Sequence, residues 1–232
     1  FSQGDLDKHG LRDALGNDPV LELPGGHNYA GNEVCALDKH SIEKWLQELD
    51  GVSAFAVASK FATRNPAHET QAMKLIGEVT GRPVSASYQL SSKLNGPKRA
   101  LTAVLNARLI GMIARLINRA SHILADIGVQ APLMVVRGDG ALISANQALE
   151  KPIETILSGP AASIVGARWL TNIDHALVSD IGGTTTDVAV LRDGRPEIDS
   201  AGAQVGPFRT MVEAVAMRTS GLGGDSEVHF VS

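Results

Sequence analysis

One run of the sequence, Asp180-Ile181-Gly182-Gly183-Thr184-Thr185-Thr186-Asp187, constrains the fold more than any other stretch. Apolar residues precede it at 176–178 and follow it at 188–191, so the pattern predicts two short strands joined by a tight glycine turn. Because glycine has no Cβ, the backbone N–H groups of such a turn are open to a phosphate. The threonine hydroxyls add donors, and Asp180 at the strand end is placed to hold Mg²⁺ directly or through water. The run predicts a phosphate and metal site.

A β-hairpin without a ligand is the simpler alternative, with an Asp at each shoulder and the threonines present for their strand propensity. Such a hairpin needs neither both acids nor three consecutive threonines, so we favour the binding site. Asp187 is expected to hold a metal-bound water or to fix the turn.

Composition bounds the class of protein. The chain has 232 residues and 44% hydrophobic content, enough for one large or two modest domains with a proper core. The formal net charge is −4, and no basic cluster is interleaved with aromatic residues. These features argue against a nucleic-acid surface and favour small molecules or proteins as partners.

The single cysteine, Cys35, excludes an intramolecular disulfide and a Cys-based zinc motif, and we expect it to be a small buried side chain. No uninterrupted apolar run approaches the ~20 residues that span a bilayer, and the N-terminus lacks the regions of a signal peptide. We therefore expect a cytoplasmic protein without membrane contact. Phe1 is not an initiator methionine, so we also expect a piece of a longer protein or a processed subunit.

Strands and helices are expected to alternate along the chain. The expected helices cover 42–49 after a capping Ser41, 65–79, a largely buried 97–127, and 159–169 after a capping Ser158. The expected strands cover 54–59, 84–90, 133–136, the two arms of the hairpin, and 197–200 after the Asp193-Gly194 turn.

Three further positions are candidates for the site. Asp139 follows a strand at its carboxyl end, where ligands bind in open α/β sheets. His68 stands beside Glu69 near a helix start just after a strand, where both can line a cleft, although the helix macrodipole stabilises a Glu there regardless of function. The glycines of Gly221–Ser226 are weak evidence alone, but their place after the hairpin strengthens it. We predict Asp180, His68 and Asp139 as catalytic residues.

The hairpin resembles the second phosphate loop of the actin, sugar kinase and Hsp70 superfamily. More narrowly, it is similar to the D-x-G-G-T-x-T-D form of the hydantoinase/oxoprolinase A family. Further stretches look like segments of that family, in the same order, and extend the likeness from about Ser53 to the carboxyl end. These stretches are Arg64–Glu69, Arg99–Ala107, Leu157–Ala161, Met211–Val215 and Gly221–Ser226.

The resemblance implies an α/β fold of the actin-like ATPase type, with RNase H-like lobes, mixed sheets flanked by helices, and ATP with Mg²⁺ as cofactors. The chain is expected to be an incomplete two-lobe fragment. Residues 1–158 would form a partial first lobe, and 159–232 a linker helix and the start of a second lobe. The metal would lie on Asp180 and Asp187. The residues implied to bind the ATP phosphates are Gly182, Gly183, Thr184, Thr185, Thr186, Gly223 and Gly224.

The implied activity is ATP-dependent hydrolysis of a cyclic amide, of the hydantoin or 5-oxoproline type, through phosphorylation of its carbonyl. A hydantoinase B-type subunit is the implied partner. Two alternatives stay open: an ATP-binding subunit of a ketone carboxylase-like or regulatory complex, and another kinase of the superfamily. Two departures from the family pattern weaken the expected activity of the fragment: no first phosphate loop precedes Ala54, and Ala216 and Arg218 replace an Asp-x-His pattern.

Overall fold

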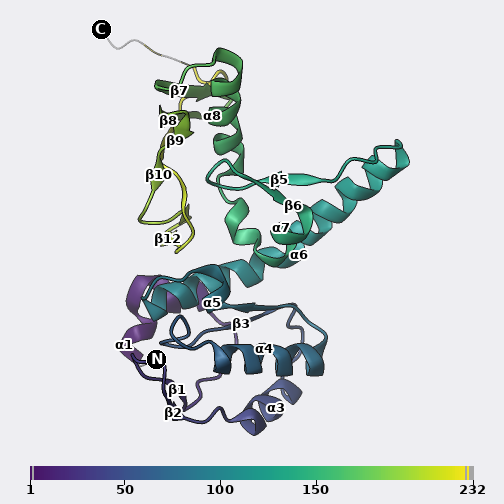
Figure 1. Cartoon of the computed structure of the whole chain (residues 1–232), viewed down its shortest axis with the longest axis vertical. Helices are drawn as coiled ribbons and strands as arrows, with labels where there is room; N and C mark the ends of the chain where they lie inside the picture. Colours follow the sequence, from purple (N-terminus) through teal and green to yellow (C-terminus); the bar gives the residue numbers. More distant parts are fainter. Residues whose placement is uncertain (2, 228, 230–232) are drawn as a thin grey trace. The chain divides into compact units, whose positions relative to one another are not determined.

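The computed structural model describes residues 1, 3–227 and 229, and the chain divides into two compact units (Figure 1). Each unit is assembled from separate stretches of sequence. Unit 1 comprises Phe1–Leu133, Ser144–Ile153 and Gln204–Val212, and unit 2 comprises Met134–Ile143, Glu154–Ala203 and Glu213–Ser232.

Unit 1 is built around a parallel pair of strands, β3 (Phe55–Val57) and β4 (Val84–Ala86). Figure 1 shows β3 between α6 (Gly96–Asp126) and α4 (Ala67–Thr80), and both helices contact the strand. The remaining elements are short: α1 (Gln3–Leu6), η1 (Lys8–Gly10), α2 (Leu11–Leu15), β1 (Gly26–His27), β2 (Glu33–Cys35), α3 (Lys39–Gln47), α5 (Ser87–Leu90), α7 (Ala145–Glu150), β11 (Gln204–Val205) and β12 (Phe208–Arg209).

Apolar spacing explains how the α3 and α4 layer closes over β3. Ile42 and Leu46, four residues apart on α3, share a core with Phe55 and with Ala72 and Ile76 of α4. Residues four apart lie on one face of a helix, so each helix presents one apolar stripe to the strand.

Several expected boundaries in unit 1 are corrected. Asp38, not Ser41, caps α3, and its carboxylate accepts from the Ser41 N–H at 3.0 Å. The strand expected over 84–90 ends at Ala86 and continues as α5. Cys35 is exposed rather than buried.

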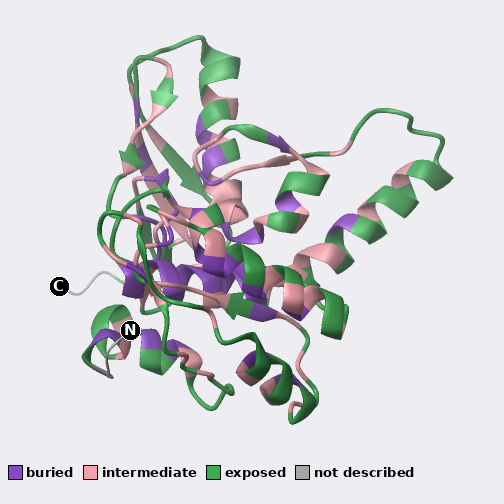
Figure 2. Cartoon of the chain, turned by 60° about the horizontal axis from the view of Figure 1, so that its bottom comes forward, coloured by how far each residue is buried: buried purple, intermediate pink, exposed green. Residues whose placement is uncertain are grey.

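The long helix α6 confirms the helix expected over 97–127, but apart from Ile117 its buried residues lie in the first half. In Figure 2 the buried positions of α6 gather in that half, and the far half is mainly exposed or intermediate. Met112, Leu116 and Ile123 are 52%, 63% and 60% exposed. By length and composition alone, α6 is also long and apolar enough to cross a membrane. The search for uninterrupted apolar runs in the sequence did not identify it, because charged residues interrupt the helix. The match to a membrane span is weak evidence, because core helices of soluble proteins pass the same test.

Unit 2 carries the predicted hairpin in a sheet ordered β14-β8-β7, and one face of that sheet packs on α8 (Ser158–Thr171). The hairpin strands are β7 (Ala176–Ile181) and β8 (Thr186–Arg192), followed by β14 (Met217–Ser220). The other strands are β5 (Met134–Val136), β9 (Arg195–Pro196), β10 (Ile198–Asp199) and β13 (Ala214–Val215). The elements β6 (Leu142–Ser144) and η2 (Pro152–Thr155) lie where the chain passes between the units.

The start of α8 differs from the expectation. Leu157, with φ 61°, is the N-cap and makes no side-chain cap hydrogen bond, whereas Ser158 is already the first helical residue. The expected tight turn at Asp193-Gly194 is present with both residues at positive φ, and β9 pairs with β8 after it.

Candidate functional site

The β7–β8 hairpin places its acidic residues opposite one another. The two strands pair antiparallel, with Asp180 opposite Asp187 and Ile181 opposite Thr186. Directly paired residues of a sheet point to the same face. The two carboxylates therefore share the face on which Val178 and Ala189 pack against α8.

The turn between the strands exposes a row of backbone donors. The Gly182 N–H donates to the Thr185 carbonyl at 2.9 Å and closes the turn. Within the described residues, no hydrogen bond uses the N–H groups of Gly183, Thr184 or Thr185. Three neighbouring N–H groups without internal partners can bind an anion.

A second glycine loop docks on this turn. The chain leaves β14 and returns so that the Gly224 N–H donates to the Gly182 carbonyl at 2.9 Å. The Asp225 N–H donates to the Gly183 carbonyl at 2.8 Å. The Thr186 hydroxyl donates to the Leu222 carbonyl at 2.7 Å, which fixes the start of the loop. The structure thus brings together all the glycines and threonines predicted for phosphate binding.

Space, rather than backbone conformation, requires glycine at this contact. None of the five glycines of the two loops has a positive φ. A Cβ on Gly223 would lie 2.6 Å from the Gly183 carbonyl carbon and 2.7 Å from that of Thr184, too close for any side chain. A Cβ on Gly183 would meet the Asp225 carboxylate at 2.7 Å.

The pair of Asp180 and Asp187 fits a cation bound together with phosphate. Like charges directly opposite in a sheet repel, and a bound cation removes that cost. The Thr219 hydroxyl donates to Asp187 Oδ1 at 2.6 Å, while Asp180 is exposed. In the described part of the chain, no group of three or more His, Cys, Asp or Glu is placed to hold a metal. Mg²⁺ suits two carboxylates, because it keeps waters and takes further oxygens from phosphates.

The beginning of α8 lies beside these carboxylates. Pro160 lines a small space together with Asp180 and Asp187. The N-terminus of a helix carries partial positive charge, which favours negative groups near it. The sequence interpretation missed this neighbour, although the Ser158-Gly159-Pro160 helix start was its signal.

Asp139 also lies in unit 2, where it is held by Arg137 at the β5–β6 turn. Arg137 Nε donates to Asp139 Oδ1 at 2.9 Å, and Nη2 donates to the second carboxylate oxygen. The Ala141 N–H donates to Oδ1 at 3.0 Å. The hydrogen bonds from Arg137 lower the pKa of Asp139, so this carboxylate is ionised near neutrality.

His68 lies in unit 1, at the second position of α4, and is 5% exposed. Its Nε2 is 2.7 Å from Glu33 Oε1, and its ring centroid is 4.4 Å from that of His27. Burial lowers the pKa of His27, with a smaller contribution from His68, so His27 favours the neutral form. Sequence reasoning missed Glu33 and His27 because they stand far from His68 in the chain.

Glu69, next to His68, has a structural environment. It is 1% exposed and accepts from the Ser87 hydroxyl at 2.7 Å and the Tyr88 N–H at 3.0 Å. It also accepts from the Ser59 N–H, and Arg99, with 0% exposure, donates to the Ser59 carbonyl. Burial raises the pKa of Glu69, while these hydrogen bonds and the Arg99 charge oppose the rise. The carboxylate ties the start of α4 to α5.

Comparison with known proteins shows where this architecture recurs. The chain is 27% identical over 206 residues to the caprolactamase subunit alpha of Pseudomonas jessenii, covering 86% of this chain and 29% of that protein. It is 26% identical to the acetophenone carboxylase gamma subunit of Aromatoleum aromaticum, covering 90% of this chain and 30% of that protein. The chain thus spans less than a third of the length of these relatives.

The fold matches the crystal structure of the ATP-dependent caprolactamase from Pseudomonas jessenii with a TM-score of 0.76 and 23% sequence identity. The match covers 94% of this chain and 35% of that one. The mixed α/β arrangement with several small sheets fits part of an actin-like ATPase, which confirms the predicted fold class.

Two family models match the sequence. The model described as hydantoinase/oxoprolinase N-terminal region covers residues 5–80, and the one described as hydantoinase/oxoprolinase covers residues 99–232. The chain therefore belongs to the hydantoinase/oxoprolinase family.

Proposed function

We propose that this chain supplies a phosphate-binding hairpin to an enzyme that uses Mg-ATP to hydrolyse a cyclic amide. The observation that carries the proposal is the docking of the Gly223-Gly224 loop on the Gly182-Gly183 turn beside two paired carboxylates. This arrangement presents backbone donors to phosphate oxygens and carboxylates to a cation at one end of a sheet.

The proposed roles follow from the donors available. The N–H groups of Gly183, Thr184 and Thr185 would bind phosphate oxygens, with the Thr184 and Thr185 hydroxyls beside them. The Thr186 hydroxyl is already used to hold the second loop, so its role is to shape the site. Phosphoryl transfer depends on positioning and on neutralising charge, and both can come from such fixed groups.

Asp180 is the proposed principal metal carboxylate, because it is exposed at the strand end, whereas Thr219 already holds Asp187. Mg-ATP would supply the phosphoryl group that activates an amide carbonyl. Asp139 and His68 remain predicted catalytic residues. For His68, the hydrogen bond to Glu33 would set which ring nitrogen carries the proton.

The proposed substrate class and partner rest on the relatives. The first relative is a caprolactamase subunit, and its structural counterpart is an ATP-dependent caprolactamase. A lactam, a hydantoin and 5-oxoproline are all cyclic amides, so one carbonyl chemistry serves the three. A partner subunit of the hydantoinase B type and a cytoplasmic location remain parts of the proposal.

A subunit of a carboxylase-like complex is the second candidate function. The chain is 26% identical to the acetophenone carboxylase gamma subunit over 90% of its own length. Phosphorylation of an enol oxygen would use the same phosphate site, so the loops alone do not separate the two candidates.

The test is phosphate release from Mg-ATP by the full-length polypeptide that carries this chain. Caprolactam, hydantoin, N-methylhydantoin and 5-oxoproline would be compared with acetone and acetophenone plus bicarbonate. Asp180→Asn should abolish the stimulation, whereas Asp193→Asn, the same change at the opposite end of the hairpin, should preserve it. Stimulation by a ring compound supports the amidohydrolase, and stimulation only by a ketone with bicarbonate supports the carboxylase. Equal activity of the two variants would refute the metal role of Asp180.

A further inference from the structure

The loop that follows β14 places a carboxylate against the phosphate-binding turn. The Asp225 N–H donates to the Gly183 carbonyl at 2.8 Å, and a Cβ on Gly183 would lie 2.7 Å from Asp225 Oδ2. The loop is also braced internally, because the Gly223 N–H donates to the Ser226 hydroxyl at 3.0 Å. The Asp225 carboxylate therefore lies against the first of the three residues whose N–H groups have no internal partner among the described residues.

This carboxylate is close enough to act on a bound phosphate. A phosphate oxygen on the Gly183 N–H would lie ~2.9 Å from the nitrogen, which is itself ~2.5 Å from the position of the Cβ. Such an oxygen is thus at most about 8 Å from Asp225 Oδ2. The Debye length at physiological ionic strength is also about 8 Å, so the two negative charges repel each other.

Basic side chains do not offset this repulsion. In the part of the chain that the structure describes, neither Asp225 nor the pair of Asp180 and Asp187 forms an ion pair. Arg218 is opposite Val188 in the sheet, one position away from Asp187, so its side chain points to the opposite face from that carboxylate. The loops therefore combine backbone donors for phosphate with side chains that are negative.

A divalent cation on the ligand changes this balance. Mg²⁺ binds phosphate oxygens and lowers the negative charge of a triphosphate by two units. Metal-free ATP therefore meets the full repulsion from Asp225, whereas Mg-ATP meets less of it. The loop favours the metal complex over the free anion, and Asp225 does not have to bind the metal to do so.

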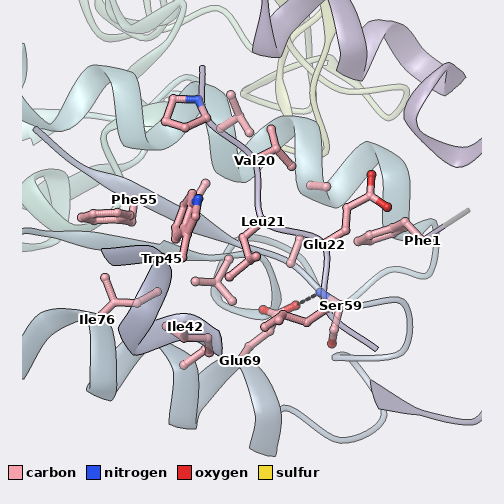
Figure 3. Close-up of a pocket in the computed structure, with 18 of the residues that line it drawn as sticks. Phe1, Val20, Leu21, Glu22, Ile42, Trp45, Phe55, Ser59, Glu69 and Ile76 are labelled. Carbon is pink, nitrogen blue, oxygen red and sulfur yellow. Dashed lines mark hydrogen bonds between the residues drawn. The ribbon is translucent and has the colours of Figure 1, made fainter. Parts of the chain in front are cut away.

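The apolar cavity of unit 1 is poorly suited to phosphate. It has a volume of about 980 Å³ and runs along β3. Figure 3 shows apolar side chains around it, among them Leu21, Ile42, Trp45, Phe55 and Ile76. Charged phosphates lose their hydration in such surroundings without gaining hydrogen bonds in return. Within the described residues, the hairpin loops are therefore the better phosphate site.

We propose that Asp225 is a specificity-determining residue of the hairpin site, whose carboxylate disfavours metal-free phosphates and selects a nucleotide in complex with a divalent cation. This role rests on the proposed function of the hairpin, and it adds a selection that the glycines and threonines do not provide. Backbone N–H groups and hydroxyls bind any phosphate oxygen, whereas a carboxylate distinguishes ligands by their charge.

Nucleotide binding to the full-length polypeptide, measured by calorimetry with Mg²⁺ or with EDTA, tests the proposal. The measured quantity is the ratio of the dissociation constants of metal-free ATP and Mg-ATP. Asp225→Asn keeps the shape of the side chain and removes its charge, so it should lower this ratio about 5- to 30-fold. Asp193→Asn removes a charge at the opposite end of the hairpin and should leave the ratio within about twofold of wild type.

A second variant and added salt separate charge from shape. Asp225→Ser should lower the ratio to a similar extent, and an effect confined to one of the two variants would overturn the role of the charge. At ~1 M KCl the Debye length falls to ~3 Å, so the difference between Asp225→Asn and wild type should largely disappear. A difference that persists at this salt concentration would also overturn the proposal.

The same titrations distinguish this role from the proposed function. If wild type binds Mg-ATP and Asp180→Asn weakens that binding, an unchanged ratio in Asp225→Asn overturns the role of Asp225 alone. If Mg-ATP does not bind to wild type, the role of Asp225 and the proposed function of the hairpin are both overturned.

Discussion

A methyl group on Gly223 should separate the two glycine loops of the hairpin site. The Cβ of Gly223→Ala would lie 2.6 Å from the Gly183 carbonyl carbon, where van der Waals contact begins at 3.4 Å. The neighbouring atoms are backbone and cannot rotate away, so the Gly221–Ser226 loop must shift by about 1 Å. Gly221→Ala is the matched control, because nothing lies within 4 Å of the corresponding Cβ.

The cost follows from what that shift breaks. Two backbone hydrogen bonds join the loops, at 2.9 Å and 2.8 Å, and each is worth about 0.5–1.5 kcal/mol. Keeping the loop docked with the extra methyl group would cost about 1–3 kcal/mol of packing strain. This is comparable to the free energy lost when the loop undocks and its two backbone hydrogen bonds break. We expect docking to weaken by about 1–3 kcal/mol, and Mg-ATP affinity of the full-length polypeptide to fall about 5- to 150-fold.

Two measurements check this reasoning. Hydrogen exchange of the Gly224 and Asp225 amides reports docking, and calorimetric titration with Mg-ATP reports the consequence for the ligand. Gly221→Ala should leave both values close to wild type. If Gly223→Ala matches this control in exchange and affinity, then the contact between the loops does not shape the site.

Three further predictions concern the units that hold these sites. Glu69→Ala should lower the free energy of unfolding by about 3–5 kcal/mol in urea titrations, because it leaves the buried donors of Ser59, Ser87 and Tyr88 without an acceptor and removes the negative charge near Arg99. The exposed control Glu78→Ala should cost under about 0.5 kcal/mol, and equal costs would contradict the buried role of Glu69. The pKa of Asp139 is lowered in the folded state, so its ionised form adds stability above the ordinary pKa, and this stability is lost as the pH falls below about 4. The difference in free energy of unfolding between the wild type and Asp139→Asn should therefore shrink between pH 7 and pH 3, and a constant difference would contradict this. Leu101→Ala, at a residue with 0% exposure, should lower the free energy of unfolding by about 2–5 kcal/mol in the same titration. Met112→Ala, at a residue with 52% exposure, should lower it by under about 1 kcal/mol, and an equal loss would show that the far half of α6 is covered in solution.

Elements that local patterning specifies were predictable from the sequence. The hairpin, α4 and α6 were anticipated because apolar spacing and glycine turns follow from backbone periodicity within a few residues. The caps were less predictable. Asp38 rather than Ser41 caps α3, since neighbouring polar residues are chemically equivalent as caps until the backbone angles are set.

The candidate site was predictable as a set of residues but not as an arrangement. Three threonines and two acids around a diglycine turn indicated phosphate and metal chemistry without any neighbour. Thr186 donates to the carbonyl of Leu222, which lies 36 residues later in the chain. His68 contacts Glu33, which lies 35 residues earlier. No local periodicity links such residues, because their proximity depends on how the chain closes its loops.

The sequence by itself determined the family, the α/β class and the hairpin with its glycine turn, since these depend on residue types at short spacing. Only the tertiary structure decided that Glu69 is a buried anchor, that half of α6 is uncovered, and that one edge of β3 faces a cavity. Burial and pairing are properties of contacts between distant segments. The local sequence pattern around a residue is the same whether or not a distant segment packs against its side chain.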